Sequence, residues 1–117
     1  MTSPNPLLRK TLVLLERARK EQRAPIWGLA SNLLRRSAVA KVEVNVGRIS
    51  RIVDDGGALL VPGKVLGTGR MEKKVVVGAF SFSTAARSKI IASGGSVMSI
   101  EQFVRAHPKG SGVKLVG

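Results

Sequence analysis

Positive charge runs through the whole sequence and is interleaved with apolar residues. Twenty Lys and Arg residues face seven Asp and Glu residues, so the net charge is +13 at pH 7. Residues 1–52 carry +8 of this charge and residues 53–117 carry +5. Hydrophobic residues still make up 44 % of the 117-residue chain, which is enough for the core of one domain. We therefore expect one folded domain over residues 1–117 with a basic surface, rather than a core with a detachable basic tail.

A polyanionic partner is the simplest reason to keep so much charge, because uncompensated charge destabilises a compact state by self-repulsion. Nucleic acid is the leading candidate, and an anionic membrane surface is the second. The chain has no Cys and therefore no disulfide framework. Residues 1–6 do not read as a secretory signal, and no apolar run approaches the roughly 20 residues that span a bilayer. These features predict a soluble, cytoplasmic protein.

Two helices are predicted in the basic N-terminal part, residues 1–40. Residues 6–22 place Leu7, Leu8, Thr11, Leu12, Leu15 and Ala18 on one face, which Val13 interrupts by falling among the charges. A second helix is expected to begin at Pro25, with Ile26, Leu29, Ala30, Leu33 and Leu34 on one face. Arg35 and Arg36 are expected at its C-terminal end, where the helix dipole favours cations.

Residues 41–117 read as an α/β core in which short strands alternate with helices. We expect Pro62 to end a buried strand, because proline cannot donate to a sheet ladder. Ser99 and Gln102 match a capping box at the start of the last helix. The predicted strands cover residues 42–46, 58–61, 73–82, 96–98 and 113–116, and residues 63–70 form a loop. The predicted helices cover about 49–53 and 99–106, and a further helix runs from a cap at Ser83 or Thr84 through Ile90 and Ile91 until Gly94-Gly95 stops it. The fold class is therefore α/β (α+β).

Motifs for catalysis fail on spacing or composition. In a Walker A reading, Gly57 lies one position too far from Gly63-Lys64, and Val65 stands where a hydroxyl is needed. A dinucleotide fingerprint starting at Gly67 would place Glu72 at its last glycine. His107 is the only imidazole, so we interpret it as a helix-end residue and predict neither zinc nor a nucleophile–base pair. We expect no enzyme, no cofactor and no metal.

Structured RNA is the partner that fits the remaining residues. It can be held through its shape, its phosphates and its 2′-hydroxyl groups, without stacked aromatic rings. The chain has few such rings, namely Trp27, Phe80, Phe82 and Phe103, and core packing explains them. Glycines let a backbone approach phosphate closely. Candidate RNA-binding residues are Arg9, Lys10, Arg35, Arg36, Gly63, Lys64, Gly67, Gly69, Arg70, Arg87, Lys89 and Lys109. Lys89 and Arg87 are expected near the start of a helix, and Lys73-Lys74 at the entry of a strand.

Several stretches together resemble the large-subunit ribosomal protein eighteen-e family, a relative of bacterial large-subunit protein fifteen. They are residues 61–69 (VPGKVLGTG), 79–83 (AFSFS) followed by 85–87 (AAR), 110–117 (GSGVKLVG), 5–7 (NPL) and 24–27 (APIW). Their order covers nearly the whole chain, and its length is similar to that of the archaeal form. The resemblance implies an irregular β-β-α winding after the N-terminal helices. It also implies a structural place in the large ribosomal subunit, with contacts to 23S-type rRNA and to neighbouring ribosomal proteins.

The same resemblance implies RNA contact at Gly63, Lys64, Gly67, Gly69 and Arg87, whereas the other candidates depend on charge alone. Three other readings stay open at this point. The charge also suits a sequence-tolerant DNA binder of the chromatin type. A membrane-surface protein would use the first helix. An enzyme acting on RNA would need an acid–base pair that the sequence does not offer.

Overall fold

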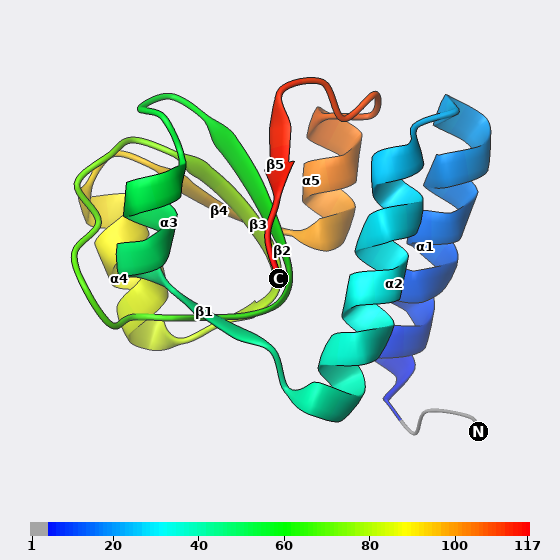
Figure 1. The fold of residues 1–117 in the computed structure, drawn as a ribbon, viewed down its shortest axis with the longest axis horizontal. Coiled ribbons are helices and arrows are strands. Elements are labelled where there is room, and N and C mark those ends of the chain that lie inside the picture. The colour runs from blue at the N-terminus through cyan, green and yellow to red at the C-terminus, as the bar shows by residue number, and fades with distance from the viewer. Residues whose placement is uncertain (1–4) are drawn as a thin grey trace.

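Two antiparallel helices form one end of the molecule. The computed structural model describes residues 5–117, in which α1 spans Pro6–Gln22 and α2 spans Pro25–Ala40. The side-chain oxygen of Asn5 caps α1 by accepting hydrogen bonds from the amides of Leu7 and Leu8 at 3.0 and 3.3 Å. Arg23 adopts a left-handed conformation (φ 51°) that ends α1. Figure 1 shows the two helices side by side at the edge of the fold.

A parallel sheet forms the centre. Its strands are β1 (Glu43–Asn45), β2 (Ala58–Leu66), β3 (Val76–Phe82), β4 (Ser96–Ser99) and β5 (Val113–Leu115). They run in the order β1-β2-β3-β4, and every pairing is parallel. β5 pairs with the first residues of β2, and β1 pairs with the last residues of β2. β1 and β5 therefore both lie along one edge of β2, and β3 lies along the other edge. The helices between the strands are α3 (Val46–Ile52), α4 (Thr84–Ala92) and α5 (Ile100–Ala106).

Helices cover both faces of the sheet, and each face has its own apolar cluster. α3 and α4 lie on one face, and α5, α1 and α2 lie on the other (Figure 1). Adjacent residues of β2 point to opposite faces, as the pleat of a strand requires: Leu59 and Val61 pack under α3 and α4, whereas Leu60 packs toward Trp27 and Phe103. The two N-terminal helices therefore share a core with the sheet.

Pro62 does not end its strand, contrary to the sequence-based expectation. β2 continues through Pro62 to Leu66, so residues 63–66 are strand and only the residues after them form the loop. The register of β2 against β3 shifts between Val61 and Lys64, which marks a bulge at Pro62-Gly63. A bulge leaves residues unpaired, so the missing amide hydrogen of proline breaks no ladder bond there.

Most helix predictions are confirmed. Two details of α2 and the start of β3 are corrected. α1, the start of α2 and the Ser99–Gln102 capping box match the expectations. Leu29 was expected on the buried face but is 57 % exposed, because α2 turns Trp27, Ala30, Ser31 and Leu34 toward the core. Arg35 and Arg36 do not end α2, which continues to Ala40 with no basic residue in its last turn. Lys73 and Lys74 precede β3 instead of opening it.

Candidate nucleic-acid interface

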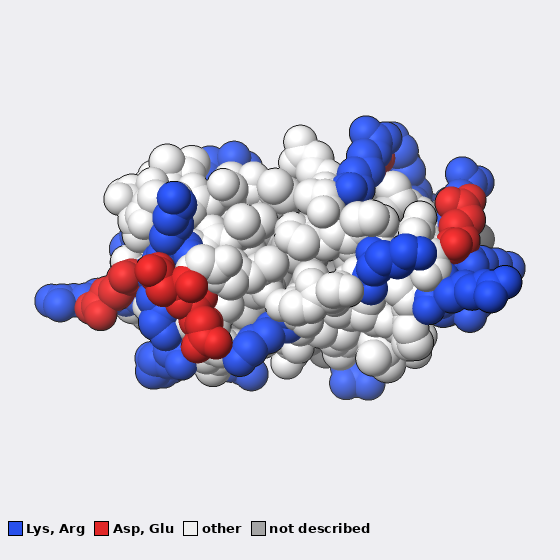
Figure 2. Space-filling model, turned by 90° about the horizontal axis from the view of Figure 1, so that it is seen from above, with Lys and Arg blue, Asp and Glu red and all other residues white. Residues whose placement is uncertain are grey.

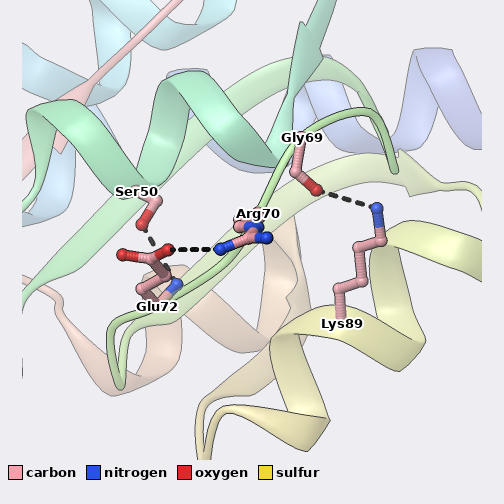
Figure 3. A network of polar contacts seen from close by, with 5 residues as sticks. All are labelled: Ser50, Gly69, Arg70, Glu72 and Lys89. Carbon is pink, nitrogen blue, oxygen red and sulfur yellow. Dashed lines mark hydrogen bonds and ion pairs between the residues drawn. The ribbon is translucent and has the colours of Figure 1, made fainter.

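The loop after β2 is fastened to two helices by its carbonyl groups. We call residues Gly67–Arg70 the glycine loop. The ammonium of Lys89, on α4, donates hydrogen bonds to the carbonyl oxygens of Gly67 and Gly69, the latter at 2.8 Å. The amide of Gly47, on α3, donates to the carbonyl of Thr68 at 3.0 Å. Figure 3 shows Lys89 reaching across to Gly69. All three carbonyls therefore have a donor within the protein, although the two bonds with Lys89 lie at the surface.

The amides of the same peptide groups face the opposite way. In a trans peptide the N–H points away from the C=O, and no cis bond occurs between residues 5 and 117. The N–H groups of Thr68, Gly69 and Arg70 are therefore directed away from Lys89 and Gly47. Within that described range, none of the three donates to another backbone carbonyl. Consecutive amides that no backbone carbonyl accepts can bind an anion, which makes this loop a candidate phosphate site.

Close packing leaves room only for glycine at two positions of the loop. A Cβ on Gly69 would lie 2.7 Å from the Cα of Gly47, and the φ of Gly69 is +93°. A Cβ on Gly67 would lie 2.5 Å from the Cβ of Ala85, at the start of α4. The glycines therefore let the loop lie directly on α3 and α4, which fixes its backbone.

Cationic side chains surround the glycine loop. Arg70 is almost fully exposed and makes a loose ion pair with Glu72 at 3.9 Å (Figure 3). The guanidinium of Arg87 lies 5.9 Å from the centre of the Phe82 ring. Arg51 was missed from the sequence. Its Nη1 lies 3.7 Å from where a Cβ of Gly47 would stand, which places it beside the contact between Gly47 and Gly69.

Lys89 was expected near the start of a helix, and that position is wrong. It lies in the last turn of α4, where the helix dipole favours a cation. Its ammonium is also occupied by two carbonyls of the glycine loop. The geometry thus gives Lys89 a role in holding the loop, which spacing alone could not reveal.

Gly63 and Lys64 lie on β2 rather than in a loop. Gly63 is buried at the bulge, and a Cβ there would meet the carbonyl of Val42 at 2.8 Å. Lys64 is exposed, and its amide donates to the same carbonyl at 3.2 Å. Both residues line an open cleft between the sheet and the two N-terminal helices.

A second basic surface follows the groove between α1 and α2. The groove has a volume of about 490 Å³ and brings together two of the predicted residues, Arg9 and Arg35. Arg17 and Lys20 line it as well, and the sequence analysis missed both. Glu16 lies among them, and its hydrogen bond with Arg19 lowers the pKa of the Glu16 carboxyl below its ordinary value. The groove therefore carries one carboxylate among several cations.

The remaining candidates do not join these surfaces. Lys10 lines a different cleft, on the side of α1 toward α5. Arg36 is exposed on α2 and lines neither the groove nor the cleft of Lys64. Lys109 lies in the turn before β5, which pairs with the beginning of β2, whereas the glycine loop follows the end of β2. Figure 2 shows Lys and Arg toward both ends of this face and a largely uncharged middle, with a larger group of acidic side chains at the end occupied by α3 and α4 and a smaller one at the opposite end.

The described residues offer neither a metal site nor a membrane span. Between residues 5 and 117, no three His, Asp or Glu side chains come together as metal ligands. In the same part of the chain, no helix combines the length and the apolar character needed to cross a bilayer. His107 ends α5 as expected, with its ring stacked on Phe103 at a centroid distance of 4.5 Å.

Residues 43–98 match a family of ribosomal proteins described as 50S-L15 and 50S-L18e together with a 60S counterpart. Curated relatives cover nearly the whole chain and bear the name large ribosomal subunit protein eL18. The relative from Methanococcus maripaludis is 44 % identical over 97 % of this chain and 95 % of its own length. The relative from Methanospirillum hungatei is 42 % identical over 96 % of this chain and 93 % of its own. The relative from Archaeoglobus fulgidus is 40 % identical over 98 % of this chain and 97 % of its own length.

These names are those of ribosomal structural proteins and not of enzymes, in agreement with the failed search for catalytic motifs. The resemblance carried by residues 61–69 and by the stretches around it is likewise confirmed. A parallel sheet with helices on both faces, preceded by two basic helices, is thus the structure of a chain that belongs to the eL18 family of large-subunit ribosomal proteins.

Proposed function

We propose that this protein is a structural constituent of the large ribosomal subunit in the cytoplasm, where it binds folded 23S-type rRNA and supports translation. The observation that carries the proposal is the glycine loop. Its three carbonyls are held by Lys89 and Gly47, so the N–H groups of the same peptides point away from these two residues, and none of them donates to a backbone carbonyl among residues 5–117. Outward amides next to cations bind phosphate without reading sequence.

Charge supports the same proposal. Ion pairs in the described chain join three arginines to Glu16, Glu72 and Glu101, and all three pairs lie at the surface. The net charge of +13 remains after all seven acidic residues have been counted, so no ion pair within the chain can compensate it. An RNA duplex presents phosphates in fixed positions, so cations held on a rigid scaffold can meet several of them together.

The proposal treats residues 1–117 as a single RNA-binding domain. Its basic helices cover residues 1–40, and its α/β core covers residues 41–117. The shared cluster of Leu15, Trp27, Leu60 and Phe103 supports this, because it joins α1 and α2 to the sheet. Neighbouring large-subunit proteins are further partners. The proposal includes no cofactor, no small-molecule substrate and no membrane.

A salt titration tests the RNA interface directly. The full chain is mixed with a fluorescent fragment of large-subunit rRNA, and affinity is measured by anisotropy between 50 and 300 mM KCl. We expect the logarithm of affinity to fall linearly with the logarithm of salt, by about 0.7–0.9 for each phosphate neutralised. A duplex DNA of equal length is the control, and we expect it to bind more weakly. A flat titration, or equal affinity for both nucleic acids, contradicts the proposal.

A further inference from the structure

An open cleft lies where the two N-terminal helices meet the sheet. Its volume is about 500 Å³, within the range of small-ligand sites of roughly 300–1,000 Å³. It lies beside the bulge of β2, at Gly63, and beneath the C-terminal end of α2. The cleft is separate from the glycine loop, none of whose residues lines it.

The inner part of the cleft is apolar and includes one aromatic ring. Leu8 and Leu34 are 8 % and 1 % exposed, and Phe80 is half-buried. A half-buried aromatic ring in an open cleft offers a surface on which a planar group such as a nucleobase can stack. The apolar walls suit the flat face of a base better than they suit a phosphate.

The rim of the cleft is charged. Lys41 and Lys64 are exposed and line it, and Glu43 lies on the same strand pair as Lys64, opposite it in register. Among residues 5–117, neither the Lys41 nor the Lys64 ammonium makes a hydrogen bond or an ion pair. Two cations beside an apolar hollow complement a group that has one flat apolar part and one anionic part. Glu43 offsets one of these two charges, and an apolar peptide segment would leave the remaining positive charge unbalanced.

We propose that this cleft receives one unstacked nucleotide of the rRNA, with its base against Phe80, Leu8 and Leu34 and its phosphate toward Lys41 and Lys64. The inference rests on the proposed RNA-binding function and adds a site to it. Glu43, which also lines the cleft, is expected to make the site prefer cytosine to uracil. A carboxylate accepts a hydrogen bond from an exocyclic amino group, as it does from that of cytosine, whereas uracil has no such donor.

Nuclear magnetic resonance of the full chain tests this with three probes: CMP, UMP and inorganic phosphate. We expect CMP to shift the methyl resonances of Leu8 and Leu34 and the ring resonances of Phe80. Phosphate alone is expected to leave these apolar resonances in place. UMP is expected to bind several-fold more weakly than CMP, and Glu43→Val is expected to remove that difference.

A matched pair of variants locates the site. Ala38 lines the cleft, whereas its neighbour Val39 is 86 % exposed and does not line it. Ala38→Phe is expected to weaken CMP binding at least tenfold, and Val39→Phe less than twofold. Equal effects of the two variants would place CMP elsewhere and overturn the inference.

The remaining outcomes separate this inference from the RNA proposal. If the protein binds the rRNA fragment with the expected salt dependence but CMP leaves Leu8 and Leu34 unshifted, the cleft inference fails and the RNA proposal stands. If indole shifts these residues and CMP does not, the cleft takes a protein side chain and the inference fails. If the rRNA fragment itself does not bind, the proposed function fails first.

Discussion

The ammonium of Lys89 donates a hydrogen bond to the carbonyl of Gly69, 20 residues earlier in the chain, at 2.8 Å. This bond joins the last turn of α4 to the glycine loop. Because the same ammonium also bonds the carbonyl of Gly67, one side chain fixes two peptide planes. The direction of the loop amides therefore depends on a residue that need not touch RNA.

Lys89→Met tests this positioning role. We expect affinity for the rRNA fragment to fall, because the loop loses two charge-assisted hydrogen bonds, and unfolding to become easier by about 1 kcal/mol. Hydrogen exchange separates the role from a direct phosphate contact. The amide of Gly47 bonds the loop carbonyl of Thr68, so its exchange should accelerate in the RNA-free variant. A Gly47 amide that exchanges as slowly in Lys89→Met as in the native chain contradicts the positioning role.

Gly69→Ala is expected to destabilise the fold by about 2–4 kcal/mol and to abolish binding of the rRNA fragment. The added Cβ meets the Cα of Gly47 at 2.7 Å and also carries the strain of a positive φ, which costs of order 1–3 kcal/mol. Gly56→Ala is the matched control, since its φ of +84° is similar but nothing lies within 4 Å of its Cβ. Urea denaturation of both variants measures the difference, and equal losses would show that backbone strain alone matters at Gly69.

Lys64→Glu should reduce incorporation into the large subunit more than Lys74→Glu. The two substitutions change the net charge equally, but Lys64 lines the cleft beside the bulge of β2, whereas Lys74 lies in the connection before β3. Co-sedimentation of tagged variants with large subunits gives the measurement. Equal incorporation would count against a specific role for Lys64.

Trp27→Phe is expected to lower the free energy of unfolding by about 1–2 kcal/mol. The indole Nε1 of Trp27 donates to the carbonyl of Pro108 at 2.8 Å, and it fastens the turn before β5 to α2. Phenylalanine keeps most of the apolar contact but leaves that carbonyl without its donor. The midpoint of urea unfolding should therefore fall, while the salt dependence of RNA binding, which counts phosphate contacts, should not change.

Three helix starts could be predicted because their signals are local. Pro6 begins α1, Pro25 begins α2, and Ser99 with Gln102 forms the capping box of α5. A proline at the first helical position lacks an amide hydrogen that would otherwise need an acceptor, and the Ser99 hydroxyl accepts from the amide of Gln102 three residues away, so each signal lies within a few residues of the sequence. The exposure of Val13 could also be predicted, because at helical spacing this residue falls among the charged side chains of α1.

The candidate interface was predicted in its residue types but not in its arrangement. Arg9 and Arg35 were chosen for their charge, yet only the packing of α1 against α2 places them in one groove with Arg17 and Lys20. Lys109 was chosen on the same grounds, and the sheet places it away from the glycine loop. Spacing along the chain does not report which surfaces meet when helices pack.

The sequence by itself determined a basic surface on a foldable core, the helix starts, the α/β class and the eL18 family, because composition, local caps and motif order are properties of the chain. Only the tertiary structure decided that β2 passes through Pro62 and that Lys89 holds the glycine loop. Both depend on partners at least 17 residues away in sequence, namely the paired residues of β3 beside β2 and the carbonyls of Gly67 and Gly69. The fold is what brings such partners to hydrogen-bonding distance.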